Sequence, residues 1–251
     1  MDAFYRSQFI RKIELLHDQV PSSQKYPFNI PAIRSLTELT LHPNATFLIG
    51  ENGMGKSTLL EAIAISIGFN PEGGTFNFNF STSDSHSELE QYIKVVKGVK
   101  RPKDGFFLRA ETFYNLATNI EELDREPGGS ERIINSYGGV SLHEQSHGES
   151  FFAAFTNRFT GNGIYILDEP EAALSPLRQL SLLSRMHDLI NKNSQFIIAT
   201  HSPIIMAYPD SIILELTENG IKHSKLEETD HYSIMKQFFD DKDRLLHHLF
   251  T

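Results

Sequence analysis

Residues 50–57 read Gly-Glu-Asn-Gly-Met-Gly-Lys-Ser and match the whole pattern G-x-x-x-x-G-K-[ST]. An apolar run at residues 46–49 precedes this segment, and a pattern of apolar residues at helical spacing follows it over residues 58–67. The glycines let the backbone turn sharply, so that successive N–H groups and the start of a helix point at one anion. A strand, a glycine-rich turn and a helix in this order predict a phosphate-binding loop.

The loop predicts specific contacts with a nucleoside triphosphate. Lys56 is expected to reach the β- and γ-phosphates, and the Ser57 hydroxyl is expected to hold Mg²⁺. The alternative is a chance glycine turn before a helix, and the strand and helix on either side argue against it. Further contacts with the nucleotide are expected from Asn52, Gly53, Met54, Gly55 and Thr58.

Residues 164–170, Ile-Tyr-Ile-Leu-Asp-Glu-Pro, place two acids directly after a continuous apolar run. Such a run is typical of a central parallel strand, which would deliver both acids to the sheet edge where α/β proteins bind ligands. Asp168 is then expected to contribute to the Mg²⁺ site, and Glu169 to polarise the water that attacks the γ-phosphorus. The alternative is a strand that simply ends in polar residues.

His201 follows the next apolar run, residues 196–199. If that run is the neighbouring strand, its end faces the same nucleotide, and the histidine can donate a hydrogen bond to the γ-phosphate. The alternative is a surface or capping histidine in a chain that has 11 histidines. The position after the strand that follows Asp168 and Glu169 favours the functional interpretation.

Length and composition limit the classes of protein to which the chain can belong. The 251 residues suit one large domain or two small ones, and 39% of them are apolar. With no cysteine, neither a disulfide nor a thiolate metal site is available, which fits a reducing cytoplasm. The net charge of −9 argues against a surface broadly dedicated to nucleic acid. No apolar stretch approaches the length of a membrane span, and the N-terminus does not read as a signal peptide.

Alternating strand and helix patterns predict an α/β fold with a mainly parallel sheet and right-handed crossovers. Residues 9–49 read as strands and predict an antiparallel portion at the N-terminus. Further elements are expected as helices at 88–100 and 176–190, a hairpin with an Asn-Gly turn near 219–220, and one amphipathic helix over 232–250.

The order of these motifs resembles the ATP-binding-cassette (ABC-type) ATPases. Residues 146–150, Ser-His-Gly-Glu-Ser, resemble a divergent form of the family's signature Leu-Ser-Gly-Gly-Gln, and residues 173–176, Ala-Leu-Ser-Pro, occupy the place of its D-loop. The resemblance implies a P-loop NTPase fold in a single domain over 1–251. Its nucleotide-binding lobe would span about 1–83 and 161–251, with an inserted helical signature lobe at about 84–160.

The resemblance also implies a mechanism and its partners. In the family, two heads enclose ATP and Mg²⁺ between them, so Ser146 and Gly148 are expected to contact the nucleotide held by Lys56 of a second copy. Glu111 is the candidate for the metal-contacting Q-loop position. The wording Thr-His-Ser-Pro at residues 200–203 and the divergent signature resemble the soluble SMC-like, RecF-like and OLD-like branch. Small stand-alone bacterial ATPases of this branch are similar at residues 26–28, 68–74 and 107–111.

These observations favour a Mg²⁺-dependent ATPase that forms an ATP-dependent homodimer and acts as a switch for a separate effector protein. A DNA-repair or phage-defence ATPase is an alternative, and a transporter subunit and a small-molecule P-loop kinase are two more. The interval between Lys56 and Asp168 has room for a compact lobe but none for a long coiled coil. Tyr26 and Phe28 are candidates for stacking on adenine, although core packing is the commoner role of an aromatic side chain. The support for DNA binding is a basic segment, which is more often a solvated helix face: Lys94, Lys97, Lys100, Arg101 and Lys103.

Overall fold

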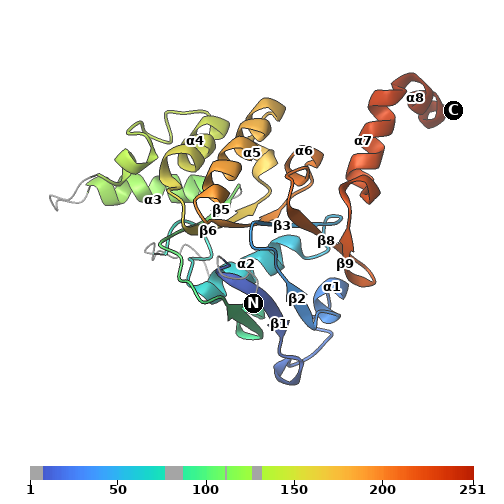
Figure 1. The fold of residues 1–251 in the computed structure, drawn as a ribbon, viewed down its shortest axis with the longest axis horizontal. Helices are drawn as coiled ribbons and strands as arrows, with labels where there is room; N and C mark the ends of the chain where they lie inside the picture. Colours follow the sequence, from blue (N-terminus) through green and yellow to red (C-terminus); the bar gives the residue numbers. More distant parts are fainter. Residues whose placement is uncertain (1–7, 77–86, 111, 126–131) are drawn as a thin grey trace.

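A six-stranded sheet forms the centre of the protein (Figure 1). The structure is a computed structural model, and it describes residues 8–76, 87–110, 112–125 and 132–251. The first five strands of the sheet pair in parallel, and the last pair is an antiparallel hairpin, as the alternating patterns predict. In spatial order the strands are β5 (Asp104–Arg109), β6 (Gly163–Asp168), β7 (Gln195–Ala199), β3 (Ala45–Ile49), β8 (Ser211–Thr217) and β9 (Gly220–Ser224).

A second, antiparallel sheet has the order β2 (Glu38–Thr40), β1 (Ile10–Leu15) and β4 (Ile93–Lys97). The prediction of a helix over 88–100 is therefore wrong: a short 3-10 turn, η3 (Glu88–Gln91), leads into a strand. The physical reason is the β-branched content of residues 93–97, which pair along β1. Lys94 also contacts Glu14 across the pair at 3.0 Å.

The two faces of the central sheet are covered by different layers (Figure 1). Alternate residues of β6 point to opposite sides: Tyr165 packs in one apolar cluster, and Ile166 packs in the other. The layer on the side of Tyr165 contains α3 (Phe113–Arg125), α4 (His147–Ala153), α5 (Pro176–Asn191) and α6 (Pro203–Met206). The layer on the side of Ile166 contains α2 (Lys56–Ile67) and the antiparallel sheet, with α1 (Pro31–Arg34) near β9.

Apart from the short η3, the helical lobe expected at about 84–160 has its described helices between Phe113 and Arg158. Besides α3 and α4 it contains a 3-10 helix, η4 (Ile133–Tyr137), and a π-helical turn, η5 (Ala154–Arg158). Residues 93–97 and 104–109, which lie inside the expected range, belong to the two sheets. The chain thus forms strands of both sheets before it enters the helices of this lobe.

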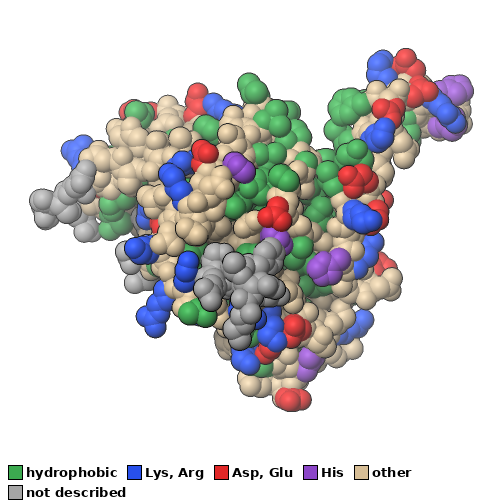
Figure 2. Space-filling model, in the orientation of Figure 1, with side chains coloured by type: hydrophobic (Ala, Val, Ile, Leu, Met, Phe, Trp, Pro, Cys, Tyr) green, Lys and Arg blue, Asp and Glu red, His purple; other side chains and the backbone are tan. Residues whose placement is uncertain are grey.

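The C-terminal segment forms two helices, α7 (Asp230–Asp240) and α8 (Lys242–Phe250), that extend away from the sheet as an arm (Figure 1). The prediction of one continuous helix over 232–250 is therefore wrong at Asp241. This residue leaves the helical conformation, and its carboxylate accepts a hydrogen bond from Arg244 N at 3.1 Å, which caps α8. Apolar side chains remain exposed along the arm: Ile234, Met235, Phe239, Leu249 and Phe250. Figure 2 shows hydrophobic side chains, in green, on the surface of the arm.

The buried carboxylate of Asp104 joins the end of the helical lobe to the start of β5. It accepts hydrogen bonds from Thr160 N at 2.9 Å and from Tyr165 Oη at 2.8 Å, and it pairs with Arg158 at 3.1 Å. Burial by itself raises the pKa of Asp104, but the hydrogen bonds from Thr160 and Tyr165 and the charge of Arg158 outweigh it and hold the pKa below its usual value.

Replacing Asp104 with asparagine is expected to lower the free energy of unfolding by about 1–3 kcal/mol near neutral pH, because the buried donors lose a charged acceptor. A carboxyl whose pKa is lower in the folded state stabilises the fold above its unfolded pKa of about 3.9. That contribution is lost as the pH falls through the folded-state pKa. Urea unfolding should therefore show a difference between wild type and variant that shrinks below about pH 4. A difference that persists unchanged in acid would contradict this account.

Candidate functional site

The predicted phosphate loop connects the end of β3 to the start of α2. Gly50 has a φ of 138°, and a Cβ atom there would lie 2.4 Å from the carbonyl oxygen of Leu216 in β8. Gly55 has a φ of 90° and directly precedes the helix, where a Cβ atom would lie 3.1 Å from Ile30. Only glycine fits both positions without strain, so the turn that the sequence predicts is built into the sheet edge.

Lys56 is the first residue of α2, and its side chain folds back into the loop. Its Nζ donates to the carbonyl oxygens of Gly50 at 2.9 Å and Glu51 at 3.1 Å. The residue is only 4% exposed, and this burial lowers the pKa of its ammonium group against the opposing effect of nearby carboxylates. A buried cation held by loop carbonyls is positioned for an anion that enters the loop.

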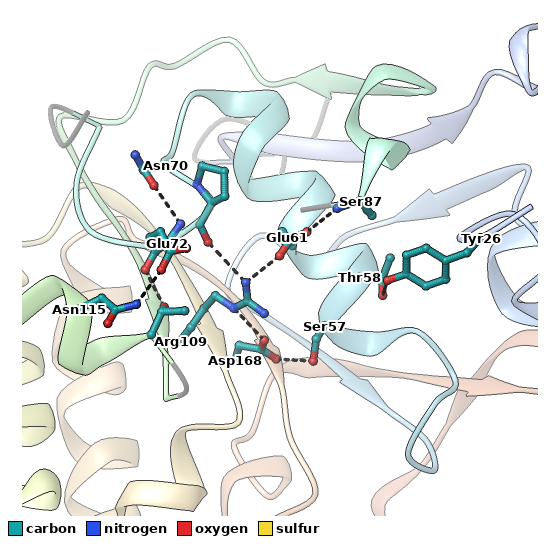
Figure 3. Close-up of polar contacts among 12 residues, drawn as sticks. Tyr26, Ser57, Thr58, Glu61, Asn70, Glu72, Ser87, Arg109, Asn115 and Asp168 are labelled. Carbon is teal, nitrogen blue, oxygen red and sulfur yellow. Dashed lines mark hydrogen bonds and ion pairs between the residues drawn. The ribbon is translucent and has the colours of Figure 1, made fainter. Parts of the chain in front are cut away.

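Ser57 and Asp168 meet at the end of β6, as the motif spacing predicts (Figure 3). The Ser57 hydroxyl donates to Asp168 Oδ1 at 3.0 Å. Among the described residues, no group of three or more His, Cys, Asp or Glu side chains could hold a metal. Mg²⁺ at phosphate sites is usually bound through one or two carboxylates together with the phosphates themselves. A hydroxyl and one carboxylate beside a phosphate loop therefore fit Mg²⁺.

Glu169 has a left-handed backbone with a φ of 48°, a conformation that costs a non-glycine residue about 1–3 kcal/mol. Its side chain is 40% exposed, whereas that of Asp168 is 7% exposed. Glu169 Oε1 lies 3.6 Å from His201 Nε2, across the gap between the ends of β6 and β7. The two adjacent acids therefore face different surroundings, and Glu169 is the one that remains accessible to water.

The backbone at His201 is held by Glu171, a residue that the sequence analysis did not single out. Glu171 Oε1 accepts a hydrogen bond from His201 N at 2.5 Å, and Oε2 accepts one from Thr200 Oγ1 at 2.8 Å. Burial raises the pKa of Glu171, and these donors oppose that shift. The sequence signal was its place in the turn after β6, which is packed against the end of β7.

Ser146 and Gly148, the candidate signature residues, lie at the N-terminus of α4. Ser146 is exposed and caps the helix, and its hydroxyl donates to Glu149 Oε2 at 2.6 Å. A Cβ atom on Gly148 would lie 2.5 Å from the carbonyl oxygen of Ala173, so this glycine allows α4 to approach the candidate D-loop. The contact with a nucleotide bound by a second copy stays a prediction.

Arg109 is a further residue of the site that the sequence analysis missed (Figure 3). It lies at the end of β5 in register with Asp168, and its Nε is 3.5 Å from Asp168 Oδ2. Its Nη1 lies 2.6 Å from Glu61 Oε2, on the helix that follows the phosphate loop. Arg109 thus joins the strand end that carries Asp168 to α2. A basic residue at the end of a predicted strand was the available signal.

Replacing Arg109 with methionine is expected to lower the free energy of unfolding by about 3 kcal/mol, because it leaves Glu61 and Asp168 as buried charges without this cation. Adding Glu61→Gln should recover part of that loss, and urea unfolding of the single and double variants measures both. Arg125→Met is the matched control, because Arg125 pairs with Glu121 on an exposed helix face and should change stability little. Equal losses of unfolding free energy in the two methionine variants would refute the conclusion that Arg109 stabilises buried charges.

The remaining candidates have different outcomes. Glu111 lies outside the described residues. Phe28 is buried and packs edge-on against Tyr92, so it belongs to the core and is not a surface for adenine. Tyr26 is 56% exposed, and its hydroxyl lies 3.2 Å from Thr58 Oγ1 beside the phosphate loop. The side chains of the basic segment are exposed on β4 and the turn that follows it.

Comparisons with known proteins find similarity to ATP-binding proteins. A family model described as "AAA domain, putative AbiEii toxin, Type IV TA system" matches residues 100–207. The chain is 25% identical over 206 residues to the energy-coupling factor transporter ATP-binding protein EcfA2 of Methanospirillum hungatei, covering 78% of this chain and 51% of that protein. It is 26% identical over 155 residues to the chromosome partition protein Smc of Methanocaldococcus jannaschii, covering 53% of this chain and 13% of that protein. The chain therefore spans about half of the first relative and a small part of the second.

Solved structures show the same fold. A nucleotide-free ATP-binding cassette from an ABC transporter superposes with a TM-score of 0.51 at 16% identity, covering 93% of this chain and 96% of that one. An ATP-binding cassette of an ABC transporter in its ADP conformation gives a TM-score of 0.50 at 18% identity, covering 88% and 92%. The chain is similar in sequence to ABC-type ATP-binding proteins and shares their fold, and both findings support the resemblance to the ABC-type ATPases.

Proposed function

We propose that this protein hydrolyses ATP with Mg²⁺ between two copies of itself and acts as a switch for a separate partner protein. The observation that carries the proposal is the convergence of three strand ends on the phosphate loop. β3 leads into Lys56, β6 ends in Asp168 and Glu169, and β7 is followed by His201. One sheet edge thus holds a cation for phosphates, oxygen ligands for a metal, and an accessible carboxylate for a water.

Each side chain has a separate task in this proposal. Lys56 exchanges its two loop carbonyls for phosphate oxygens, and Ser57 and Asp168 hold Mg²⁺, which neutralises charge on the phosphates. Glu169 orients the attacking water and accepts its proton, and His201 donates a hydrogen bond toward the γ-phosphate. Because the ammonium group of Lys56 is already buried, little reorganisation of the loop is needed when phosphate enters.

The exposure of Ser146 supports a site shared between two copies. Its hydroxyl lies at the N-terminus of α4, on a helix end that is open to a second molecule. In a two-fold dimer, each copy would offer this end to the nucleotide of the other. ATP then stabilises the closed pair only to the extent that its γ-phosphate binds the closed state better than the open one. Hydrolysis removes that difference, and the pair loosens.

A protein partner is favoured by the exposed apolar side chains of the arm. Phe239 is 73% exposed and Phe250 is 81% exposed, on helices that project from the rest of the protein. Surface apolar groups that gather in one place commonly mark interaction sites. Among the described residues, none of the helices combines the length and apolar character needed to span a bilayer. If the chain were instead a transporter subunit, as several relatives are named, a membrane protein would be its partner.

DNA binding is the second candidate, and one observation favours it. The basic segment keeps Lys97 exposed at the end of β4, and Lys100 and Arg101 exposed in the turn that follows. Phosphate contacts release counterions, so DNA binding would weaken steeply as salt increases. A titration of duplex DNA at several salt concentrations separates the candidates. A steep slope that is lost when these three residues are neutralised would favour the DNA role.

Phosphate release from MgATP by the purified protein tests the proposal itself. We expect the turnover rate per protein molecule to rise with protein concentration, because a complete site needs two copies. EDTA and the Lys56→Met variant should each abolish turnover. If the protein neither binds nor hydrolyses ATP under these conditions, the proposed function is wrong.

A further inference from the structure

A second histidine lies against His201, in a groove of about 1080 Å³ between α7 and the sheet edge. His231 is in the first turn of α7, and its Nε2 lies 2.9 Å from His201 Nδ1. The other ring nitrogen of His201, Nε2, lies 3.6 Å from Glu169 Oε1. Three side chains from β6, β7 and the arm therefore form a row that ends at the accessible carboxylate. Neither the motifs nor the comparisons point to His231.

The row restricts where the proton on His201 can reside. The 2.9 Å contact between the two ring nitrogens needs one donor and one acceptor, so at least one ring is neutral. Burial and the charge of Lys56 lower the pKa of both histidines against nearby carboxylates, which favours one N–H on each ring. If His201 donated through Nδ1, its bare Nε2 would face a carboxylate oxygen, and two acceptors would repel each other. If His231 donates through Nε2, His201 carries its proton on Nε2 and presents a donor to Glu169. The second arrangement satisfies every contact.

The backbone on both sides is fixed, so the pair cannot easily rearrange. Glu171 holds His201 N, and Thr229, which is fully buried, caps α7 by accepting a hydrogen bond from Tyr232 N at 3.3 Å. His231 is thus positioned by the anchored base of the arm and not by its exposed end. A ring nitrogen is commonly oriented in this way by the hydrogen bond that the other nitrogen makes.

We propose that His231 is a positioning residue that holds His201 in the tautomer with its proton on Nε2. This inference rests on the proposed function, since a donor at Nε2 is what a γ-phosphate requires. It also links the arm to the site: a movement of the base of α7 would withdraw the donor from His201 Nδ1 and release the tautomer.

Two near-isosteric substitutions test the proposal with opposite expectations. His231→Gln keeps an N–H donor toward His201, and we expect its kcat to stay within about threefold of wild type. His231→Leu removes the donor to His201 Nδ1 without adding a charge, so the tautomer of His201 is no longer fixed, and its kcat should fall about tenfold while the KM for ATP is unchanged. The same two substitutions at His223, an exposed histidine on β9, are the matched controls and should leave both constants unchanged.

Nitrogen NMR of ¹⁵N-histidine-labelled protein provides a readout that does not depend on activity. Wild type and His231→Gln should show His201 protonated on Nε2, and His231→Leu should show a mixture of the two tautomers. Wild type with its proton on Nδ1, or equal kcat in the Gln and Leu variants of an active enzyme, would overturn the inference. If wild type hydrolyses no ATP, the proposed function fails instead, and the NMR result still decides whether His231 sets the tautomer.

Discussion

Replacing Glu169 with glutamine is expected to lower ATP turnover about 10²- to 10⁴-fold, the range that a positioned general base commonly contributes. Glutamine has nearly the same shape and can still accept a hydrogen bond from His201, but it cannot take the proton of the attacking water. ATP binding should persist, because the groups expected to contact phosphates, Lys56 above all, are unchanged. With binding retained and hydrolysis blocked, the closed state should accumulate.

Light scattering of the Glu169→Gln variant with and without MgATP measures this accumulation. We expect a mass that doubles in MgATP and returns to that of the monomer in ADP. Glu218→Gln is the matched control, since Glu218 is exposed in the turn between β8 and β9, and it should behave as wild type does. A Glu169→Gln protein that binds ATP and remains monomeric would show that ATP does not join two copies here.

The central sheet could be predicted from the sequence because its strands are continuous apolar runs. Residues 164–167 and 196–199 are buried on both faces, and both lie where these runs predict strands. The loop at 50–57 could also be predicted, because its glycines serve a local backbone turn. In both cases the pattern that indicates the structure is complete within a few consecutive residues.

Strand β4 was misread because its exposed lysines hide the period of its apolar residues. Residues 93–97 read Ile-Lys-Val-Val-Lys, and Ile93 is the one residue of this strand that is buried. A strand at the edge of a small sheet needs apolar residues on one face only, so its pattern is short and easily taken for one face of a helix. The break at Asp241 was missed because a single capping side chain decides it.

The supporting residues of the site could not be predicted, because their partners lie far away in the sequence. Arg109 pairs with Glu61, 48 residues earlier, and Glu171 and His231 each lie 30 residues from the group that they hold. Such contacts arise only when the sheet brings strand ends together. The motif residues were visible because nucleotide chemistry demands particular side chains, whereas a supporting residue can be any side chain that fits.

Mixing two inactive variants is expected to restore ATP turnover if each site draws on both copies. Lys56→Met removes the cation from the phosphate loop, and Ser146→Arg places a bulky side chain at the exposed end of α4. Loss of one charge-stabilising donor commonly costs about 10²- to 10³-fold in kcat, so each variant alone should be nearly inactive. In a mixed pair, one site has Lys56 from one copy and Ser146 from the other, and it is complete.

Random pairing of equal amounts makes about half of the pairs mixed, each with one complete site, so turnover should return to about a quarter of the wild-type value. A variant that carries both substitutions, mixed with either single variant, forms no complete site and is the control for impurities and nonspecific activity. If Lys56 and Ser146 acted within the same copy, no mixture would exceed the single variants. Restoration in the first mixture and not in the second therefore distinguishes a site shared between copies from a site within one chain.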